Sequence, residues 1–262
     1  MVSNENRLEA LREAFCERIV VLDGAAGTSI QDMHLKPADF GGPQLDGCNE
    51  NLVRTRPDRI RELHRSFLAA GADIIETNTF GATSVVLAEY GLQQDAHELN
   101  RRAADLARTE ADAASTDGRL RFVAGSMGPT TKSISVTGGV TFAQLVAAYQ
   151  EQAEGLLEGG ADVLLLETVQ DTLNCKAGLD GIMQALRRTG APAGVAVSGT
   201  IESGLEIDFG PNPNTGMCTS IGLSIANITL GAGGAAAAFS GQQSGYCCGT
   251  QVGQYRFDRP VS

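Results

Sequence analysis

A short sequence pattern that occurs twice restricts the possible folds of this chain more than any other feature. Gly71-Ala72-Asp73 and Gly160-Ala161-Asp162 each follow an amphipathic segment, and each leads through apolar residues to a Glu-Thr pair, at Glu76-Thr77 and Glu167-Thr168. An apolar run between a glycine turn and polar residues is typical of a buried β-strand. The spacing of the two copies leaves room for two units of strand and helix, so the pattern indicates a regular repeat of such units.

Other segments extend this alternation. Apolar runs predict strands at residues 19–22, 72–78, 121–125, 163–167 and 193–198. Apolar residues at helical spacing predict helices over residues 8–15, 55–70, 99–107, 141–158 and 175–186, with a loop at 24–54. Thr55 with Asp58, and Thr141 with Gln144, stand at capping-box positions at the start of two of these helices.

Strands that alternate with helices indicate an α/β fold with a parallel sheet, and continuous apolar strands suit a sheet that is buried on both faces. We predict a (β/α)8 barrel of the TIM type, in which the chemistry lies at the carboxyl ends of the strands. Asp23, Glu76, Asn78 and Glu167 all fall at such ends. An open doubly wound sheet is the alternative, but the turn at 24–27 lacks the G-x-G-x-x-G fingerprint of a dinucleotide site.

The pattern changes after residue 200. Residues 201–262 contain eleven glycines, six charged residues and no lysine, and they predict only a strand at 220–224, an apolar run at 235–239 and a last strand that leads into Cys247. A complete barrel typically needs ~250 residues. We therefore expect one domain over residues 1–262, with a regular part at 1–200 and a divergent, shortened part at 201–262 in which the barrel is incomplete or abbreviated.

Composition excludes several classes of partner. With 31 acidic and 20 basic residues the formal net charge is −11, which disfavours nucleic acid and anionic membranes as partners. The sequence has no segment that resembles a signal peptide or a transmembrane helix. Its six cysteines lack the spacing of a small disulfide scaffold, so we expect a cytoplasmic protein whose cysteines are thiols.

Two adjacent cysteines, Cys247 and Cys248, lie between glycines near the end of the chain. Neighbouring thiols can form a disulfide only with strained geometry. A thiolate-rich site built from several loops would most readily bind zinc. The alternative is that both cysteines are buried and pack as small apolar residues.

Several motifs together resemble the homocysteine S-methyltransferase family, and within it the homocysteine-binding module of cobalamin-dependent methionine synthase. The resemblance covers about residues 18–200 and rests on segments 22–28, 71–80, 125–130, 166–168 and 197–200. Residues 245–250, Gly-Tyr-Cys-Cys-Gly-Thr, are similar to the terminal double-cysteine zinc motif of the family. The segment at 128–135 is more similar to the cobalamin type than to the types that use betaine or S-methylmethionine.

The resemblance implies a reaction. A zinc ion held by three cysteine thiolates would take the homocysteine sulfur as a fourth ligand and keep it deprotonated. The sulfur would then accept a methyl group from methylcobalamin, which is remethylated from methyltetrahydrofolate, and the product would be methionine. The cobalamin-binding and folate-binding modules expected from this resemblance are not contained in this sequence, so we expect them on a partner.

The sequence departs from the family at the first zinc cysteine. A Gly-Leu-Asn-Cys-like strand end is replaced by Gly222-Leu223-Ser224-Ile225, which has no cysteine. Cys218, seven residues before Ile225, is the remaining thiol of the region and the candidate for the third ligand, although this shift predicts that its side chain lies away from the strand end. Cys16 and Cys175 are expected in the core, and Cys48 is expected to be a free thiol in a loop.

By resemblance, six residues would bind the amino acid end of homocysteine. Asp23 and Glu167 would meet the ammonium, and the amides near Ala26 and Gly27 would meet the carboxylate. Thr77 and Asn78 would line the same rim. For acidic residues at strand ends the alternative is a helix cap or a solvated charge. The three histidines, His34, His64 and His97, are expected to have surface or structural roles.

Three functions stay open. The first is a zinc-dependent methyltransferase module that acts on homocysteine. The second is an inactive or truncated barrel that retains the fold and at most binds an amino acid. The third is a homocysteine methyltransferase that uses betaine or S-methylmethionine.

Overall fold

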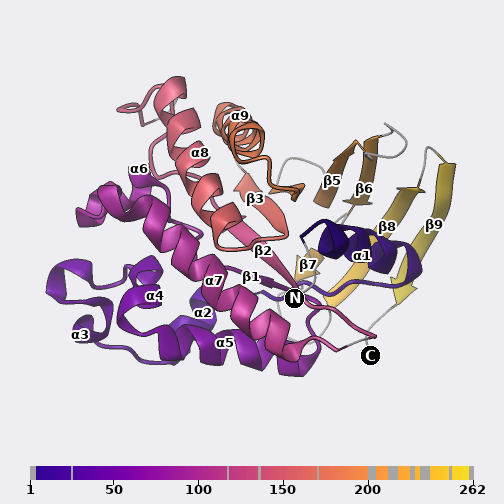
Figure 1. Cartoon of the computed structure of the whole chain (residues 1–262), viewed down its shortest axis with the longest axis horizontal. Helices are drawn as coiled ribbons and strands as arrows, with labels where there is room; N and C mark the ends of the chain where they lie inside the picture. The colour runs from indigo at the N-terminus through magenta and orange to yellow at the C-terminus, as the bar shows by residue number, and fades with distance from the viewer. Residues whose placement is uncertain are drawn as a thin grey trace.

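The computed structural model describes residues 4–24, 26–116, 118–134, 137–169 and 171–199, and after these only five strand segments. Its longer helices are α1 (Asn4–Glu17), α5 (Pro57–Ala70), α7 (Ala96–Ala114), α8 (Phe142–Glu158) and α9 (Thr172–Thr189). Its first four strands are β1 (Ile74–Glu76), β2 (Phe122–Met127), β3 (Val163–Val169) and β4 (Gly194–Gly199). These elements confirm the predicted alternation of helix and strand, and hence the α/β class (Figure 1).

The four strands form a parallel sheet in the order β1-β2-β3-β4. Helices α5, α7, α8 and α9 form a layer on one side of this sheet (Figure 1), where Ile75, Val123 and Leu164 contribute to the main core. Residues that alternate with these, such as Ile74 and Phe122, pack with Leu11 and Phe15 of α1. Because successive side chains of a strand point to opposite faces, the sheet is buried between α1 and the other helices.

The predicted strand at 19–22 is reduced to a single parallel bridge between Leu22 and Ile74. Backbone bonds still align it with β1, because Asp23 N donates to Ile74 O at 3.0 Å and Asp73 N donates to Val21 O at 2.8 Å. On this short segment Ile19 is 63% exposed and Val21 is 49% exposed. The outer edge of the sheet is therefore apolar.

The predicted loop at 24–54 is largely helical. It contains α2 (Ala26–Asp32), α3 (Pro37–Phe40), α4 (Leu52–Thr55) and 3-10 turns at Pro43–Leu45 and Asn49–Asn51. Its apolar residues, including Ile30, Phe40 and Leu52, form a second core with α5 and α7. Farther along, α6 (Ser84–Leu87) and 3-10 turns at Ala88–Tyr90 and Gln93–Asp95 connect β1 to α7.

One predicted helix cap is confirmed and the other is wrong. Thr141 caps α8 through its side chain and forms a capping box with Gln144. Helix α5 instead begins after Arg56, which makes no side-chain cap. Thr55 is the last residue of α4 and its hydroxyl donates to Asn51 O at 3.2 Å, so it is not available to cap α5.

The two copies of the Gly-Ala-Asp pattern make the same contacts. Asp73 accepts a hydrogen bond from Val21 N at 3.0 Å, and Asp162 accepts one from Val123 N at 2.8 Å. Each aspartate thus joins the amino end of its strand to the strand before it. Each also pairs with arginine: Asp162 with Arg108, and Asp73 with three arginines, at positions 18, 119 and 121.

Beyond β4 the described strands are antiparallel. They are β5 (Leu205–Pro211), β6 (Cys218–Ser224), β7 (Ile228–Leu230), β8 (Ala237–Cys247) and β9 (Thr250–Arg259). They continue the sheet in the order β4-β5-β6-β8-β7, with β9 paired to β8. The described residues therefore form an open sheet, and a closed ring of parallel strands is not found among them.

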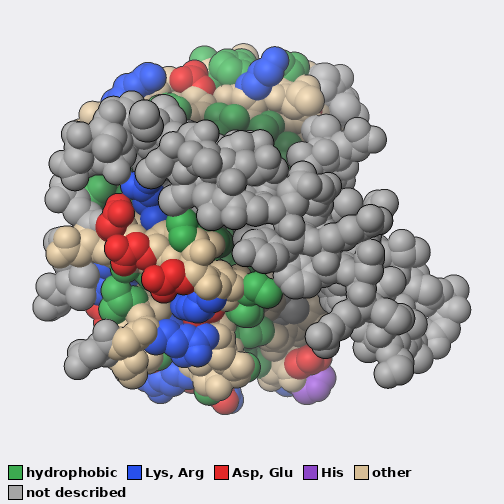
Figure 2. Space-filling model, turned by 90° about the vertical axis from the view of Figure 1, so that its right-hand side faces the viewer, with side chains coloured by type: hydrophobic (Ala, Val, Ile, Leu, Met, Phe, Trp, Pro, Cys, Tyr) green, Lys and Arg blue, Asp and Glu red, His purple; other side chains and the backbone are tan. Residues whose placement is uncertain are grey.

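Ion pairs join several helices of the described part. Arg7 of α1 pairs with Asp112 of α7 at 2.7 Å, and Arg54 of α4 pairs with Asp95 at the start of α7 at 2.7 Å. On the face shown in Figure 2, acidic side chains lie next to Lys and Arg side chains. Within the described residues, none of the helices has both the length and the apolar character that a membrane span requires.

Candidate functional site

Three carboxyl groups, from the first strand segment, β1 and β3, come together at the carboxyl end of the parallel sheet. Asp23 follows Leu22, Glu76 ends β1, and Glu167 lies in β3 just after its last regular pair with β4. Asp23 Oδ1 accepts a hydrogen bond from Glu76 N at 2.9 Å, which fixes the first carboxyl against the second strand. Of the predicted site residues, Asp23 and Glu167 are thus brought into one cluster, together with Glu76.

Burial governs the electrostatics of this carboxyl cluster. It raises the pKa of Asp23 to about 7, with a further increase from the charge of Glu167, while the N–H of Glu76 acts in the opposite direction. It raises the pKa of Glu76 to about 8, and the charges of Glu167 and Asp23 add to this increase. The pKa of Glu167 is raised by burial as well. Like charges crowded in a partly buried place favour a bound cation or proton.

Glu167 is supported by hydroxyl groups. Ser126 Oγ on β2 donates a hydrogen bond to Glu167 Oε1. The hydroxyl of Thr168 also hydrogen-bonds to Glu167, and these two contacts oppose the effect of burial on its pKa. Thr168 has a φ of 55°, a left-handed conformation that is unfavourable for a β-branched residue. The local backbone is therefore constrained where Glu167 enters the cluster.

Thr77 and Asn78, which are predicted to line the rim of the site, are both buried. Thr77 is only 3% exposed, and its hydroxyl lies 2.6 Å from that of Thr79 and accepts from Ser126 N at 3.0 Å. Asn78 Nδ2 donates to Asn49 O at 2.7 Å. Their described contacts are made with the protein itself, which indicates a scaffolding role.

Ala26 and Gly27 are the first two residues of α2, directly after the strand that carries Asp23. No heavy atom lies within 4 Å of the position that a Cβ would take on Gly24 or Gly27. Open space next to a backbone turn allows a ligand group to approach the amides closely. The predicted role of these amides toward a carboxylate stays a prediction.

The predicted zinc ligands fall in the C-terminal strands. Cys218 is the first residue of β6, Cys247 is the last residue of β8, and Cys248 lies outside the described residues. A cluster of three or more metal-binding side chains was not found in the part of the chain that the structure describes. By donor chemistry, three thiolates fit a zinc ion.

Three other cysteines, at positions 16, 48 and 175, are not joined in disulfides. Cys48 is fully buried in the second core, and burial raises its pKa to about 11. Cys175 is partly buried against the main core, as predicted. Cys16 is exposed, so its predicted place in the core is wrong, because it lies on a face of α1 that the sheet does not cover. The high pKa of Cys48 disfavours the thiolate that a metal needs.

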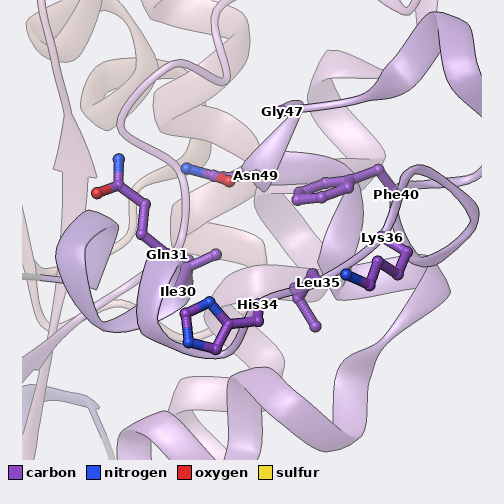
Figure 3. A pocket seen from close by; sticks show the side chains of 8 residues that line it. All are labelled: Ile30, Gln31, His34, Leu35, Lys36, Phe40, Gly47 and Asn49. Carbon is purple, nitrogen blue, oxygen red and sulfur yellow. The ribbon is translucent and has the colours of Figure 1, made fainter.

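A separate pocket of about 450 Å³ lies in the helical segment after the first strand. Figure 3 shows its walls, with Ile30 and Phe40 as apolar parts and His34, Lys36 and Asn49 as polar parts. The backbone carbonyl of Asn49 is the group that Asn78 binds, so the pocket wall adjoins the scaffold of the carboxyl cluster. None of the six predicted substrate residues lines this pocket.

The histidines have the predicted kinds of roles. His34 is exposed at the pocket, and His97 lies 3.4 Å from Glu158. His64 is buried on α5, and burial lowers its pKa to about 4.

Sequence reasoning missed Ser126 and Glu50, and it placed Glu76 at a strand end without a role in the site. Glu76 stands beside Thr77 in the repeated pattern, which is a usable signal. Ser126 is a single serine within an apolar strand, and its contact with Glu167 spans 41 residues. Glu50 is a buried carboxyl, with a pKa raised by burial, that accepts from Gly81 N at 2.9 Å and so anchors the loop after β1.

The comparisons with known proteins give consistent results. A family model described as homocysteine S-methyltransferase matches residues 20–217. Methionine synthase of Mycobacterium leprae (strain TN) is 42% identical over 193 residues, which cover 74% of this chain and 16% of that protein. The chain therefore corresponds to a small part of the length of this relative.

Solved structures of the homocysteine methyltransferase MmuM from Escherichia coli are also similar. The oxidised form matches with a TM-score of 0.59 and 25% identity, covering 74% of this chain and 66% of that chain. The metallated form matches with a TM-score of 0.56 and 25% identity, covering 72% and 65%. The shared part is thus just under two thirds of those chains.

Proposed function

The chain belongs to the homocysteine S-methyltransferase family, and from this premise we propose that it binds homocysteine as the module in which a methyl group is transferred to the homocysteine thiol, giving methionine. The observation that carries this proposal is the carboxyl cluster of Asp23, Glu76 and Glu167 at the carboxyl end of the sheet. A partly buried cluster of carboxyls suits the cationic end of an amino acid.

In this proposal Asp23 and Glu167 bind the substrate ammonium. Replacing a shared proton by an ammonium group relieves the repulsion between the carboxyls and supplies hydrogen-bond donors to them. The substrate carboxylate would lie at the amides near Ala26 and Gly27, where the space beside the backbone is open. Thr77 and Asn78 would support this rim from behind.

Zinc is the proposed metal, with Cys247 and Cys248 as two of its ligands. Zinc bound there would keep a coordinated substrate thiol deprotonated and therefore nucleophilic. Cys218 is the remaining thiol of this region for the third position. The metallated form of the similar E. coli enzyme is in line with a metal in this family.

We further propose that the methyl donor is methylcobalamin, carried by a separate cobalamin-binding module and remethylated from methyltetrahydrofolate on a folate-binding module. The identity with a methionine synthase supports this donor. The chain's part is then to bind and orient homocysteine so that its sulfur faces the incoming methyl group.

The proposed fold of residues 1–262 is a (β/α)8 barrel of the TIM type that is incomplete or abbreviated after residue 200. The first strand supports this, because Ile19 and Val21 leave an apolar edge that one more strand would cover. Burying such side chains is favourable by ~1.5–3 kcal/mol each when complete.

Calorimetric titration of the whole chain with homocysteine, in reducing buffer with zinc, tests the proposal. Glu167→Gln should weaken binding by ~1.5–3 kcal/mol, the range for a hydrogen bond to a charged group. Glu62→Gln is the matched control, because Glu62 is on the outer face of α5 and pairs with Arg59 at 2.8 Å. Equal affinity of the native chain and Glu167→Gln would contradict the ammonium site.

The same titration separates the alternative functions. Binding of homocysteine that needs zinc, and that a thiol-free analogue such as 2-aminobutyrate cannot reproduce, supports the methyltransferase module. Equal binding of both ligands without zinc would instead indicate an inactive barrel that only recognises an amino acid.

A further inference from the structure

Ser126 lies on β2, and its hydroxyl donates a hydrogen bond to Glu167 of the proposed homocysteine site. We propose that Ser126 is a positioning residue whose hydroxyl holds the Glu167 side chain in the carboxyl cluster and makes Glu167 the charged member that meets the substrate ammonium. This role rests on the proposed function and deepens it. Ser126 acts through Glu167 and does not need to touch the substrate.

The backbone of Ser126 is fixed by two threonines. Ser126 N donates to Thr77 Oγ1 at 3.0 Å, and Ser126 O accepts from Thr79 Oγ1 at 2.7 Å. Gln152 of α8 holds the same region, because its Nε2 donates to Thr79 O at 2.8 Å. With the residue only 2% exposed, the hydroxyl on β2 is a well-placed donor to Glu167 on β3.

The three carboxyls of the cluster differ in the donors that they receive. Glu167 receives the hydroxyls of Ser126 and Thr168, and Asp23 receives the N–H of Glu76. Among the described residues, no donor to the carboxyl of Glu76 is found. Donors favour a charged carboxylate, and burial without donors favours a protonated one. The donor from Ser126 therefore favours the charged form of Glu167 over that of Glu76.

The backbone next to Glu167 supports the same conclusion independently. Thr168 has a φ of 55°, and the pairing of β3 with β4 is irregular between Leu166 and Val169. Non-glycine residues keep such a conformation only where the surroundings enforce it, and such positions cluster at functional sites. The turn brings the Thr168 hydroxyl to the carboxylate that Ser126 also binds.

Carboxyl titration followed by NMR on the whole chain, with ¹³C-labelled glutamate, tests the role of Ser126 without any ligand. In Ser126→Ala the Glu167 carboxyl loses a donor, so it should take up its proton at higher pH than in the native chain. The charged groups that face it, Asp23 and Glu76, are followed in the same way, Asp23 through labelled aspartate.

Homocysteine binding gives the second measurement. At pH 7 the dissociation constant of Ser126→Ala should rise roughly tenfold or more, as for the loss of a hydrogen bond to a charged group. The difference from the native chain should widen as the pH falls, because Glu167 is then protonated sooner in the variant. A merely structural role would lower affinity equally at every pH.

Two variants serve as controls. Ser126→Thr keeps the hydroxyl and should titrate like the native chain. Ser66→Ala removes a hydroxyl that donates to Leu63 O at 2.7 Å within α5, and it should leave Glu167 unchanged.

Two results would overturn the proposal. One is an unchanged Glu167 titration in Ser126→Ala, and the other is an equal shift in Ser126→Ala and Ser126→Thr. If the titration moves as expected but the native chain binds no homocysteine, the proposed function fails while the hold of Ser126 on Glu167 stands.

Discussion

Replacing Asp73 by asparagine should lower the stability of the fold by about 2–3 kcal/mol at pH 7. Asp73 is fully buried and accepts from Arg18 at 2.7 Å, from Arg119 at 2.8 Å and from Val21 N at 3.0 Å. Asparagine keeps one acceptor oxygen but presents an NH₂ group to the guanidinium groups. Removing one partner of a buried ion pair costs about 3–5 kcal/mol, and partial exposure of Arg18 and Arg119 reduces this.

The pKa of Asp73 gives a similar magnitude for its contribution to the free energy of unfolding. Although burial acts to raise it, the bonds from Arg18, Val21 N and Arg119 lower it from 3.8 to about 2. One pKa unit corresponds to about 1.4 kcal/mol, so the charge stabilises the fold by roughly 2 kcal/mol. Because the folded pKa lies below the unfolded one, this contribution is complete above about pH 4 and is lost as the pH falls toward 2.

Urea unfolding followed by circular dichroism at pH 7, 5 and 3 measures the effect. The native chain should exceed Asp73→Asn by the same amount at pH 7 and 5, and by less at pH 3. Asp162→Asn is the matched comparison, because burial raises the pKa of Asp162 despite its pairing with Arg108. The contribution of Asp162 should therefore decline as the pH rises, which is the opposite trend. A loss for Asp73→Asn that stays constant down to pH 3 would refute the ionic explanation.

Three further predictions concern the metal and the helices. Two zinc ligands match the family and the third is displaced, so we expect metal analysis to show well under one zinc per chain. Cys248→Ser should lower this zinc content and Cys218→Ser should not. Full zinc occupancy in the native chain that is lost in Cys218→Ser would contradict this. Tyr149→Phe should cost about 1–2 kcal/mol in thermal unfolding, because its hydroxyl donates to Asn174 Oδ1 at 2.6 Å in a buried place, and an unchanged melting temperature would show that this bond contributes nothing. Gly155→Ala should lower the free energy of unfolding, measured by urea titration, by about 1–2 kcal/mol. The added Cβ would lie 2.5 Å from a backbone oxygen of α7, and this clash outweighs the higher helix propensity of alanine. A stabilised variant would mean that the helices move apart freely.

The regular part of the fold could be predicted from local patterns. The capping box at Thr141 and Gln144 and the apolar run of β3 each contain their own signal within a few residues. The short helices of the 24–54 segment could not be found this way, because α3 and α4 have four residues each and show no period. Their stability comes from the second core, to which α5 and α7 contribute.

Part of the candidate site could also be predicted from local sequence patterns. Asp23 and Glu167 stand at the ends of apolar runs. They are expected to lie close together because the carboxyl ends of parallel strands meet at one edge of the sheet. The contact between Ser126 and Glu167 depends on the register of β2 and β3, which places Met127 opposite Leu166. After residue 200 the sequence predicted the strand at 220–224 and the strand that leads into Cys247, which lie in β6 and β8. It predicted neither β5, β7 and β9 nor the antiparallel pairing, because a glycine-rich segment with few charges has no clear period of its own.

The residues at the two ends of the parallel sheet make different kinds of contact. At the amino ends, Asp73 and Asp162 hold each strand to its predecessor with contacts that do not involve the site. At the carboxyl ends, the cluster of Asp23, Glu76 and Glu167 carries a concentration of like charge that burial makes unfavourable. Substitutions at the carboxyl ends can therefore change what the cluster binds while the aspartate contacts at the amino ends still hold the strands together.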